Sequence, residues 1–187
     1  MPGTRDARHR ILKATADLVT TRGLDAATPA AIAERADAGK MSLYRHFSGK
    51  DEVVAEALAE RDLHYRVLLL GDSADIPPRE RLLAMFDHAA GVADRLGSSF
   101  IGCPYVSARL DLPDDDHPAA PVGVAHKDGM LRELAALLDD IGVPDPEQRA
   151  QVVLMLLDGA VIHSVIRGNG DPLRAARAAL PGLISAP

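Results

Sequence analysis

The sequence contains few of the residues on which disulfide-bonded, aromatic-rich or membrane-spanning proteins depend. Its 187 residues include one cysteine, so no disulfide can form within the chain, which indicates a reducing compartment such as the cytoplasm. Aromatic residues make up 3% and tryptophan is absent, which leaves alanine and leucine to form the core. The longest apolar stretch, residues 152–166, includes Asp158 and His163 and is too short and polar to span a bilayer. With a polar start and no signal peptide, the sequence predicts a cytoplasmic protein without a membrane partner.

The net charge of −6 is unevenly distributed along the chain. Residues 1–50 hold nine lysines and arginines against five acidic residues, whereas residues 51–187 hold 12 against 22. A basic segment followed by an acidic one suggests that the first segment binds a polyanion. A chance fluctuation explains the same counts, so the charge alone does not decide between the two interpretations.

Glycine and proline divide the chain into helix-length segments, and no segment has the alternating pattern of a strand. We therefore expect an all-α protein of about nine helices, at about residues 5–22, 29–36, 40–46, 50–70, 79–96, 102–110, 117–141, 146–167 and 172–184. Residues 1–50 would form a three-helix head, and residues 51–187 a helical body joined to it by the long helix 50–70. Residues 72–78 are expected to be a linker. Ser48 and Asp51 suggest a capping box at the start of the long helix, and the pairs Asp145-Pro146 and Asp171-Pro172 suggest caps further on.

The head has the pattern of a helix-turn-helix, in which residues 37–39 join two short helices. The apolar residues expected to pack these helices against the first one are Ile32, Ala33, Ala36, Leu43 and Phe47, facing Ile11, Leu18 and Val19. Residues 28–36, 40–47 and 50–53 together resemble the signature of the tetracycline-repressor (TetR) family, over roughly residues 8–55. The most specific element is Leu43-Tyr44-Arg45-His46-Phe47 with Lys50 three residues beyond. The chain departs from the family pattern at Asp37, where glycine is common, and at Gly39, where a small hydroxyl residue is common.

The resemblance implies that the second short helix enters the major groove of double-stranded DNA. The residues that it assigns to DNA binding are Thr28, Gly39, Lys40, Met41, Ser42, Tyr44, Arg45, His46 and Lys50. Lysine and arginine can bind guanine, and a methionine can contact a thymine methyl group. Helix N-termini and the Tyr44 hydroxyl favour phosphate contacts. Taken singly, Tyr44 could equally be a packing residue and His46 a helix cap.

Four elements of the body resemble a subset of TetR-like regulators. They are Gly102-Cys103-Pro104-Tyr105, His117-Pro118, Ala125-His126-Lys127 and Asp158-Gly159-Ala160. The resemblance implies an effector pocket in the body and dimerisation through the last two long helices. The candidate pocket residues are Phe86, Phe100, Cys103, Tyr105, His126, Met130, Met155 and Asp158, each of which could also be ordinary core. The candidate dimer residues are Leu156, Gly159, Ala160, His163, Leu173, Ala176 and Leu180, and the alternative is that these helices lie inside a monomer.

The body does not have the spacing of a metal centre or a hydrolase. Asp158 and His163 lie five residues apart, about 140° around a helix, so they do not form a ready pair. The acidic run at residues 114–116 lacks the glycine and distal glutamate of a calcium loop. Cys103 is most simply a small buried apolar residue. We expect no catalytic residues, no metal, no cofactor and no enzymatic activity.

These observations predict a sequence-specific DNA-binding transcriptional regulator. The prediction is a ligand-responsive repressor that binds a palindromic operator as a homodimer. Its partners would be operator DNA, a small-molecule effector and a second copy of itself. The first alternative is a small-molecule-binding or catalytic all-α protein whose helix-turn-helix is incidental. The second is a nucleoid-type protein that binds DNA without sequence preference, which would leave the acidic body unexplained.

Overall fold

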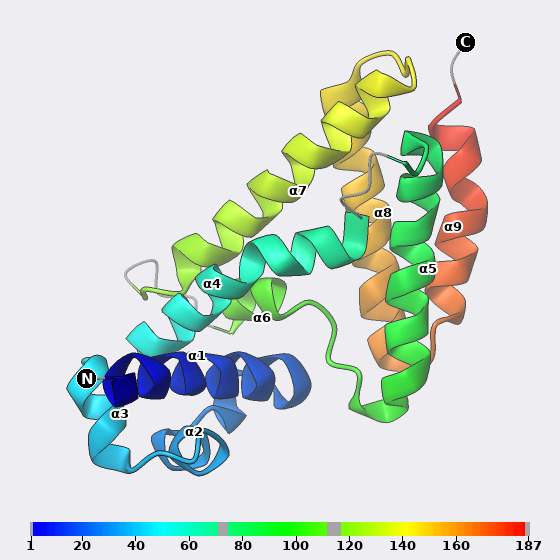
Figure 1. Ribbon diagram of the computed structural model, residues 1–187. Helices are drawn as coiled ribbons and strands as arrows, with labels where there is room; N and C mark the ends of the chain where they lie inside the picture. Colours follow the sequence, from blue (N-terminus) through cyan, green and yellow to red (C-terminus); the bar gives the residue numbers. More distant parts are fainter. Residues whose placement is uncertain (1, 71–74, 112–116, 186–187) are drawn as a thin grey trace. The chain divides into compact units, whose positions relative to one another are not determined.

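A computed structural model of the chain describes residues 2–70, 75–111 and 117–185, and side chains from residue 6 onward. The acidic run at 114–116 and part of the linker at 72–78 lie outside the described residues. The helices are α1 (Pro2–Arg22), α2 (Pro29–Arg35), α3 (Lys40–His46), α4 (Lys50–Leu70), α5 (Pro78–Leu96), α6 (Pro104–Leu110), α7 (Ala120–Asp140), α8 (Pro146–Arg167) and α9 (Asp171–Leu183), with two 3₁₀ turns, Leu24–Ala26 and Gly97–Ser99 (Figure 1). The described ranges contain no strand, which confirms the all-α prediction.

The helix ends follow the glycine and proline pattern closely, but some caps differ from the prediction. The Thr28 side chain accepts a hydrogen bond from the Ala31 N–H at the start of α2, as expected. At the start of α4 it is Glu52, and not Asp51, whose carboxylate accepts from both the N–H and the hydroxyl of Ser48. The expected cap at Asp171 is also wrong, because this residue lies inside α9 and Gly170 precedes the helix. Asp145 does precede α8, but without a side-chain cap hydrogen bond.

The described chain divides into two compact units, and the division differs from the expected boundary at residue 50. Unit 1 contains residues 1–63 and 103–126, and unit 2 contains residues 64–102 and 127–187. Helix α6 and the first residues of α7 therefore pack with the N-terminal helices. The body is shared between the units because α4 and α7 each contribute residues to both.

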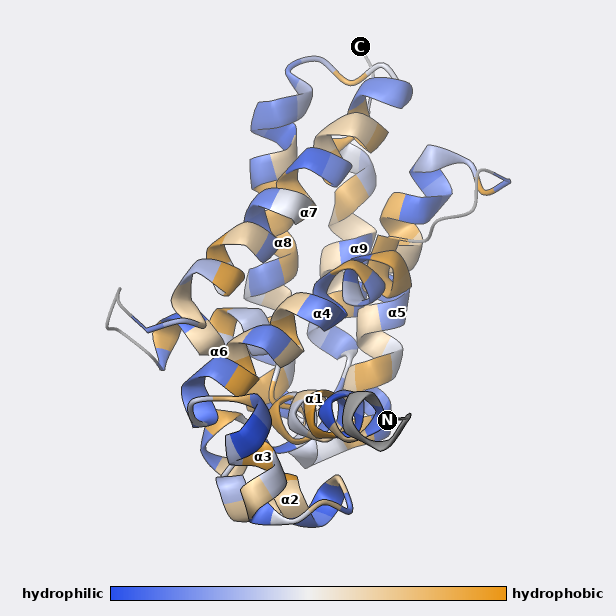
Figure 2. Cartoon of the chain, turned by 60° about the vertical axis from the view of Figure 1, so that its left-hand side comes forward, coloured by the Kyte–Doolittle hydropathy of each residue, from blue (hydrophilic) through white to orange (hydrophobic). Residues whose placement is uncertain are grey.

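Unit 1 contains the expected core of the helix-turn-helix. The predicted apolar residues Ile11, Leu18, Val19, Ile32, Ala33, Ala36, Leu43 and Phe47 are all buried. Helix α1 contacts both α2 and α3, and hydrophobic segments alternate with hydrophilic ones along these helices (Figure 2). This burial fixes which side of the short helix α3 faces away from the protein.

Unit 2 is built around α5, α8 and α9, which lie side by side (Figure 1). Its core contains Phe86 and Met85 from α5, residues along one stripe of α8, and Leu173 and Leu180 from α9. The close approach of α5 and α9 depends on Gly170, because a Cβ at this position would lie 2.5 Å from the Ala90 carbonyl oxygen. The Gly170 N–H donates to the Asp94 carboxylate, which also accepts from Arg174.

Candidate functional site

Helix α3 presents a continuous exposed surface opposite its buried residue Leu43. Met41 and Arg45 lie two residues before and after Leu43, which places both on the far side of the helix, one turn apart. The Met41 side chain is 75% exposed, and Tyr44 is 52% exposed. Met41 and Tyr44 are therefore free of the protein core and accessible on this side of α3.

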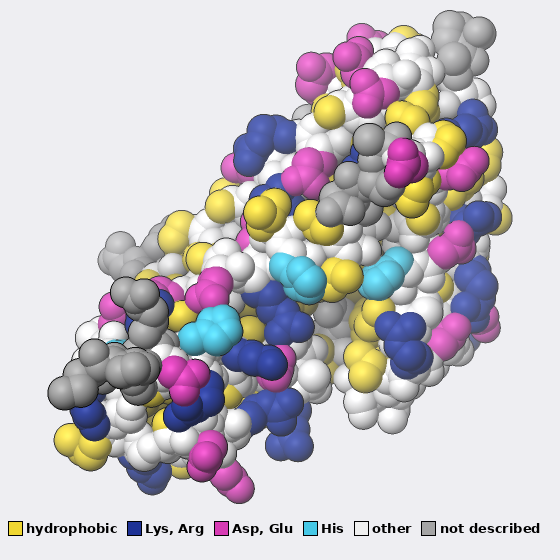
Figure 3. Space-filling model, viewed as in Figure 1, with side chains coloured by type: hydrophobic (Ala, Val, Ile, Leu, Met, Phe, Trp, Pro, Cys, Tyr) yellow, Lys and Arg dark blue, Asp and Glu magenta, His cyan; other side chains and the backbone are white. Residues whose placement is uncertain are grey.

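The remaining DNA-binding candidates surround this surface or flank it. Lys40 and Arg45 are exposed, whereas Ser42, His46 and Lys50 are partly buried. Gly39 begins α3 without a side-chain cap, as expected, and Thr28 is exposed at the start of α2. On the face shown in Figure 3, lysine and arginine side chains are spread over the N-terminal helices together with acidic ones.

The turn between α2 and α3 is held by a residue that the sequence analysis missed. The Arg10 guanidinium donates to the carbonyl oxygens of Ala36, at 3.0 Å, and of Asp37, at 3.3 Å. Asp37 has a φ of 47°, the left-handed conformation in which aspartate is among the better tolerated residues, so the expected turn forms without glycine. The sequence offered no signal for Arg10, because the contact spans 26 residues.

Ion pairs and a cation–π contact join the helices around α3. The Arg8 guanidinium lies over the ring of Phe47, the residue that follows α3, 5.3 Å from its centroid, and it also pairs with Glu56 of α4. Asp17 of α1 pairs with Arg35 of α2 and with Arg61 of α4. These contacts link α1 to α2, to α4 and to the end of α3.

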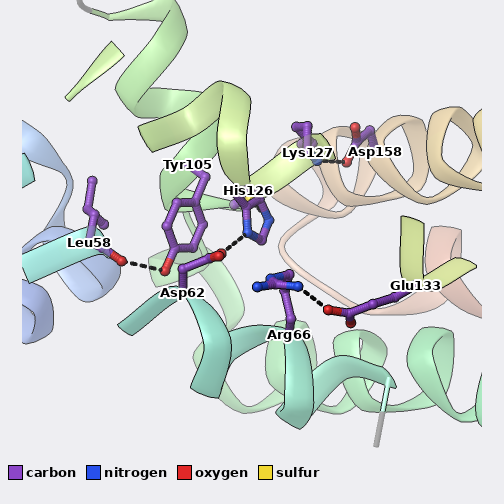
Figure 4. A network of polar contacts seen from close by, with 9 residues as sticks. Leu58, Asp62, Arg66, Tyr105, His126, Lys127, Glu133 and Asp158 are labelled. Atoms are coloured by element: carbon purple, nitrogen blue, oxygen red, sulfur yellow. Dashed lines mark hydrogen bonds and ion pairs between the residues drawn. The ribbon is translucent and has the colours of Figure 1, made fainter. Parts of the chain in front are cut away.

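Three of the expected pocket residues, Cys103, Tyr105 and His126, form a cluster in unit 1. The Tyr105 and His126 rings are stacked, with centroids 3.9 Å apart, and Tyr105 donates to the Leu58 carbonyl oxygen (Figure 4). His126 Nδ1 lies 2.6 Å from the Asp62 carboxylate, and its Nε2 lies 3.9 Å from Cys103 Sγ. Asp62 was not predicted, because nothing in its local sequence indicates a partner 64 residues away.

The other five pocket candidates lie in unit 2. Phe86 and Met130 are fully buried in its core, with Phe100 at the core's edge. Asp158 pairs with Lys127 at 2.6 Å, and both side chains remain partly exposed (Figure 4). The Met155 side chain is 64% exposed on α8, and its role in a pocket stays a prediction.

Comparisons with known proteins agree with these observations. The model of the TetR family of bacterial regulatory proteins matches residues 11–57, and that of the tetracyclin repressor-like C-terminal domain matches residues 108–186. A putative TetR-type regulator from Streptomyces avermitilis is 28% identical, with a TM-score of 0.77 over 92% of this chain and 97% of that one. The two family models and the similarity to the Streptomyces avermitilis structure decide the assignment. The chain belongs to the TetR family.

Other solved structures share the fold at lower identity. A TetR-family regulator from Streptomyces coelicolor is 24% identical, with a TM-score of 0.81 over 98% of this chain and 90% of that one. Escherichia coli NemR in its reduced form is 22% identical, with a TM-score of 0.82 over 97% of this chain and all of that one. No curated protein matches the chain. As a TetR-family protein, the chain is a DNA-binding, ligand-responsive transcriptional regulator, and the family is generally not enzymatic.

The expected TetR dimer residues fall into two groups. Ala160, Leu173, Ala176 and Leu180 are buried in the core of unit 2. Leu156, Gly159 and His163 are partly or fully exposed. The side chains that the sequence analysis missed are Ile162 and Ile166, which are exposed on the same stripe of α8 as Met155 and Gly159.

Proposed function

We propose that this TetR-family protein is a homodimeric repressor that binds a palindromic operator through α3 and releases it when an effector binds. The observation that carries the proposal is the exposed face of α3, with Met41 and Arg45 opposite the buried Leu43. A helix of this kind reads base edges in the major groove, where arginine binds guanine and methionine contacts a thymine methyl group. We place this activity in the cytoplasm, with no catalytic turnover.

Dimerisation is proposed through the outer stripe of α8, formed by Met155, Gly159, Ile162 and Ile166. The exposed large apolar side chains of α8 are Met155, Ile162, Val165 and Ile166. The exposed side of α9 adds small residues, among them Ala175 and Ala178. A two-fold dimer carries two α3 helices, and a palindromic operator offers them two half-sites about 34–36 Å apart, one helical turn of DNA.

Selection of DNA sequences by the purified protein tests the proposal. We expect a palindrome whose half-sites lie about one helical turn apart, because a two-fold dimer reads symmetric DNA. Selected sequences without symmetry would contradict the dimer, and no enrichment at all would contradict sequence-specific binding. Lys50 at the start of α4 is a phosphate candidate, so Lys50→Ala should flatten the dependence of log K on log salt by roughly one unit without changing the selected sequence.

The effector is proposed to bind in unit 2, near the pair of Lys127 and Asp158. This pair places opposite charges in the apolar middle of α7 and α8, and it is accessible enough to exchange one partner for a polar ligand. A compound found by thermal-shift screening can be titrated calorimetrically with and without operator. Linkage requires that operator DNA weaken effector binding by the same factor by which the effector weakens operator binding. Equal effector affinity in both titrations would contradict the switch while leaving the DNA-binding proposal intact.

A further inference from the structure

The turn between α2 and α3 has a hydrogen-bonding pattern that favours glycine at the position of Asp37. The Ala38 N–H donates to the Ala33 carbonyl oxygen across the end of α2. The Asp37 N–H donates to the carbonyl oxygen of Glu34. These two bonds form a Schellman motif, in which the residue after the helix cap is left-handed and is usually glycine. Asp37 adopts this conformation with a φ of 47°, at a conformational cost that glycine does not have.

The Arg10 guanidinium stabilises this turn from α1. Its Nε donates to the Ala36 carbonyl oxygen at 3.0 Å, and Nη2 donates to that of Asp37 at 3.3 Å. Carbonyl oxygens at a helix C-terminus have no partner within the helix and carry partial negative charge, so a cation that donates to two of them stabilises this backbone geometry. The third nitrogen of the guanidinium pairs with Asp6, one turn back on α1, which holds the group in this orientation.

Helix α3 depends on this turn because it is short and has no cap of its own. It contains seven residues, and isolated helices of this length are not stable in water. Gly39 gives its N-terminus no side-chain cap, and Leu43 is its buried residue. The direction of α3, and with it the positions of Met41 and Arg45, is therefore set by the turn together with the burial of Leu43.

We propose that Arg10 is a positioning residue for DNA recognition, which holds the α2–α3 turn in the conformation that presents α3 to base edges. Asp37 makes the chain depend on Arg10, because a left-handed aspartate requires a stabilising contact that glycine does not. Without Arg10, a smaller fraction of the molecules has the native turn, and operator affinity falls in proportion to that fraction. The inference rests on the proposed reading of DNA by α3, and it assigns Arg10 itself no contact with the DNA.

Two other roles for Arg10 predict different results. A contact between Arg10 and a DNA phosphate would contribute to the binding of any sequence, whereas a positioning role affects the sequence that α3 reads. The ratio of the affinities for operator and for unrelated DNA distinguishes these two roles. A contribution to fold stability alone would be independent of the residue at position 37, so a replacement of Asp37 distinguishes this third role.

The affinities of Arg10→Ala for the selected operator and for an unrelated duplex of equal length, measured by fluorescence anisotropy at one salt concentration, test the proposal. The ratio of operator affinity to unrelated affinity should fall at least about tenfold, or about 1.4 kcal/mol for two lost hydrogen bonds, because phosphate contacts alone tolerate a displaced α3. Lys13→Ala is the matched control, since it removes an exposed cation from the same helix. This control should keep the wild-type ratio. An equal loss on both duplexes in Arg10→Ala, or no loss on either, would overturn the proposal.

Replacing Asp37 with glycine tests why the turn depends on Arg10. In the Asp37→Gly background, Arg10→Ala should lower the ratio by no more than about twofold, because glycine is left-handed without help. Asp145→Gly is the matched control, since Asp145 is also left-handed, with a φ of 53°, but precedes α8 in unit 2. In this control background the loss caused by Arg10→Ala should remain complete. A complete loss in the Asp37→Gly background as well would refute the positioning role.

Hydrogen exchange in the free protein distinguishes a failure of this inference from a failure of the proposed function. The Ala38 amide reports the turn directly, because it is hydrogen-bonded to the Ala33 carbonyl oxygen. In Arg10→Ala this amide should exchange at least about fivefold faster, and Asp37→Gly should restore its protection. A wild-type protein that selects no DNA sequence would contradict the proposed function. An unchanged exchange rate of the Ala38 amide in Arg10→Ala would contradict this inference even where an operator is found.

Discussion

Replacing Gly159 with arginine should separate the two subunits of the proposed dimer without damaging the protomer. Gly159 lies on the outer stripe of α8, between Met155 and Ile162. A Cβ built at Gly159 meets no atom within 4 Å outside its own helix, so the protomer has room for the new side chain. In a two-fold interface, however, the stripe of one subunit packs against the same stripe of the other.

The strength of this interface can be worked out from the exposed fractions. Met155 is 64% exposed, Ile162 52%, Val165 38% and Ile166 71%, which together amount to about two fully exposed side chains. At roughly 1.5–3 kcal/mol for each buried side chain, the gain is about 3–6 kcal/mol per subunit and twice that for the pair. Association itself costs at least about 4 kcal/mol, so the net free energy of dimerisation is small. An unpaired charge at its centre costs several kcal/mol and removes this margin.

Analytical ultracentrifugation across a concentration series should therefore find Gly159→Arg monomeric where the wild type is dimeric. The operator affinity of Gly159→Arg should fall because the dimer is lost, although α3 is unchanged. Gly49→Arg is the matched control, since its Cβ also meets nothing within 4 Å and it lies outside α8. This control should remain a dimer. A folded Gly159→Arg protein with the wild-type dimerisation constant would refute the assignment of the interface to this stripe.

Other consequences of the structure can be measured on single variants. Arg45→Ala should cost about 1–3 kcal/mol of operator binding, roughly 5–150-fold by anisotropy, and relax selectivity at one base step; a uniform loss on all sequences would instead indicate a phosphate contact. Gly170→Ala places a Cβ 2.5 Å from the Ala90 carbonyl oxygen and should lower the melting temperature, by roughly 6–12 °C for about 3 kcal/mol, whereas Gly182→Ala in open space should not lower it. Hydrogen bonds from Arg174 hold the pKa of Asp94 below its usual value, so this carboxylate stabilises the fold above about pH 4 and the contribution is lost as the pH falls further. The melting temperature of Asp94→Asn should accordingly vary less than that of wild type in this acidic range.

The sequence predicted the helices well because their ends are set by local chemistry. Thr28 and Pro29 are adjacent to each other and mark the start of α2 without any knowledge of the fold. The same holds for the inner face of the head, where a short amphipathic helix has only one apolar stripe, so Leu43 had to be buried and Arg45 exposed. The exposure of Met41 follows in the same way from its position opposite Leu43.

Contacts between distant segments could not be predicted in this way. Asp62 meets His126 across 64 residues, and Arg10 meets the α2–α3 turn across 26, and neither pair leaves a local pattern. The adjacent residues His126 and Lys127 looked like one motif, yet they have separate partners, Asp62 in unit 1 and Asp158 in unit 2. The candidate pocket residues, which were grouped by their chemistry, likewise belong partly to unit 1 and partly to unit 2.

Helix α8 shows why an apolar sequence alone does not reveal what covers it. The whole helix, Pro146–Arg167, is long and apolar enough to cross a membrane by length and composition, although the sequence analysis judged its central stretch too short. One stripe of α8 is packed in the core of unit 2, and Asp158 in its middle is paired with Lys127. The stripe packed in the core of unit 2 fits a helix that is covered by protein on this side. The opposite stripe then needs its own cover, and a second copy of α8 provides an apolar surface of the same length.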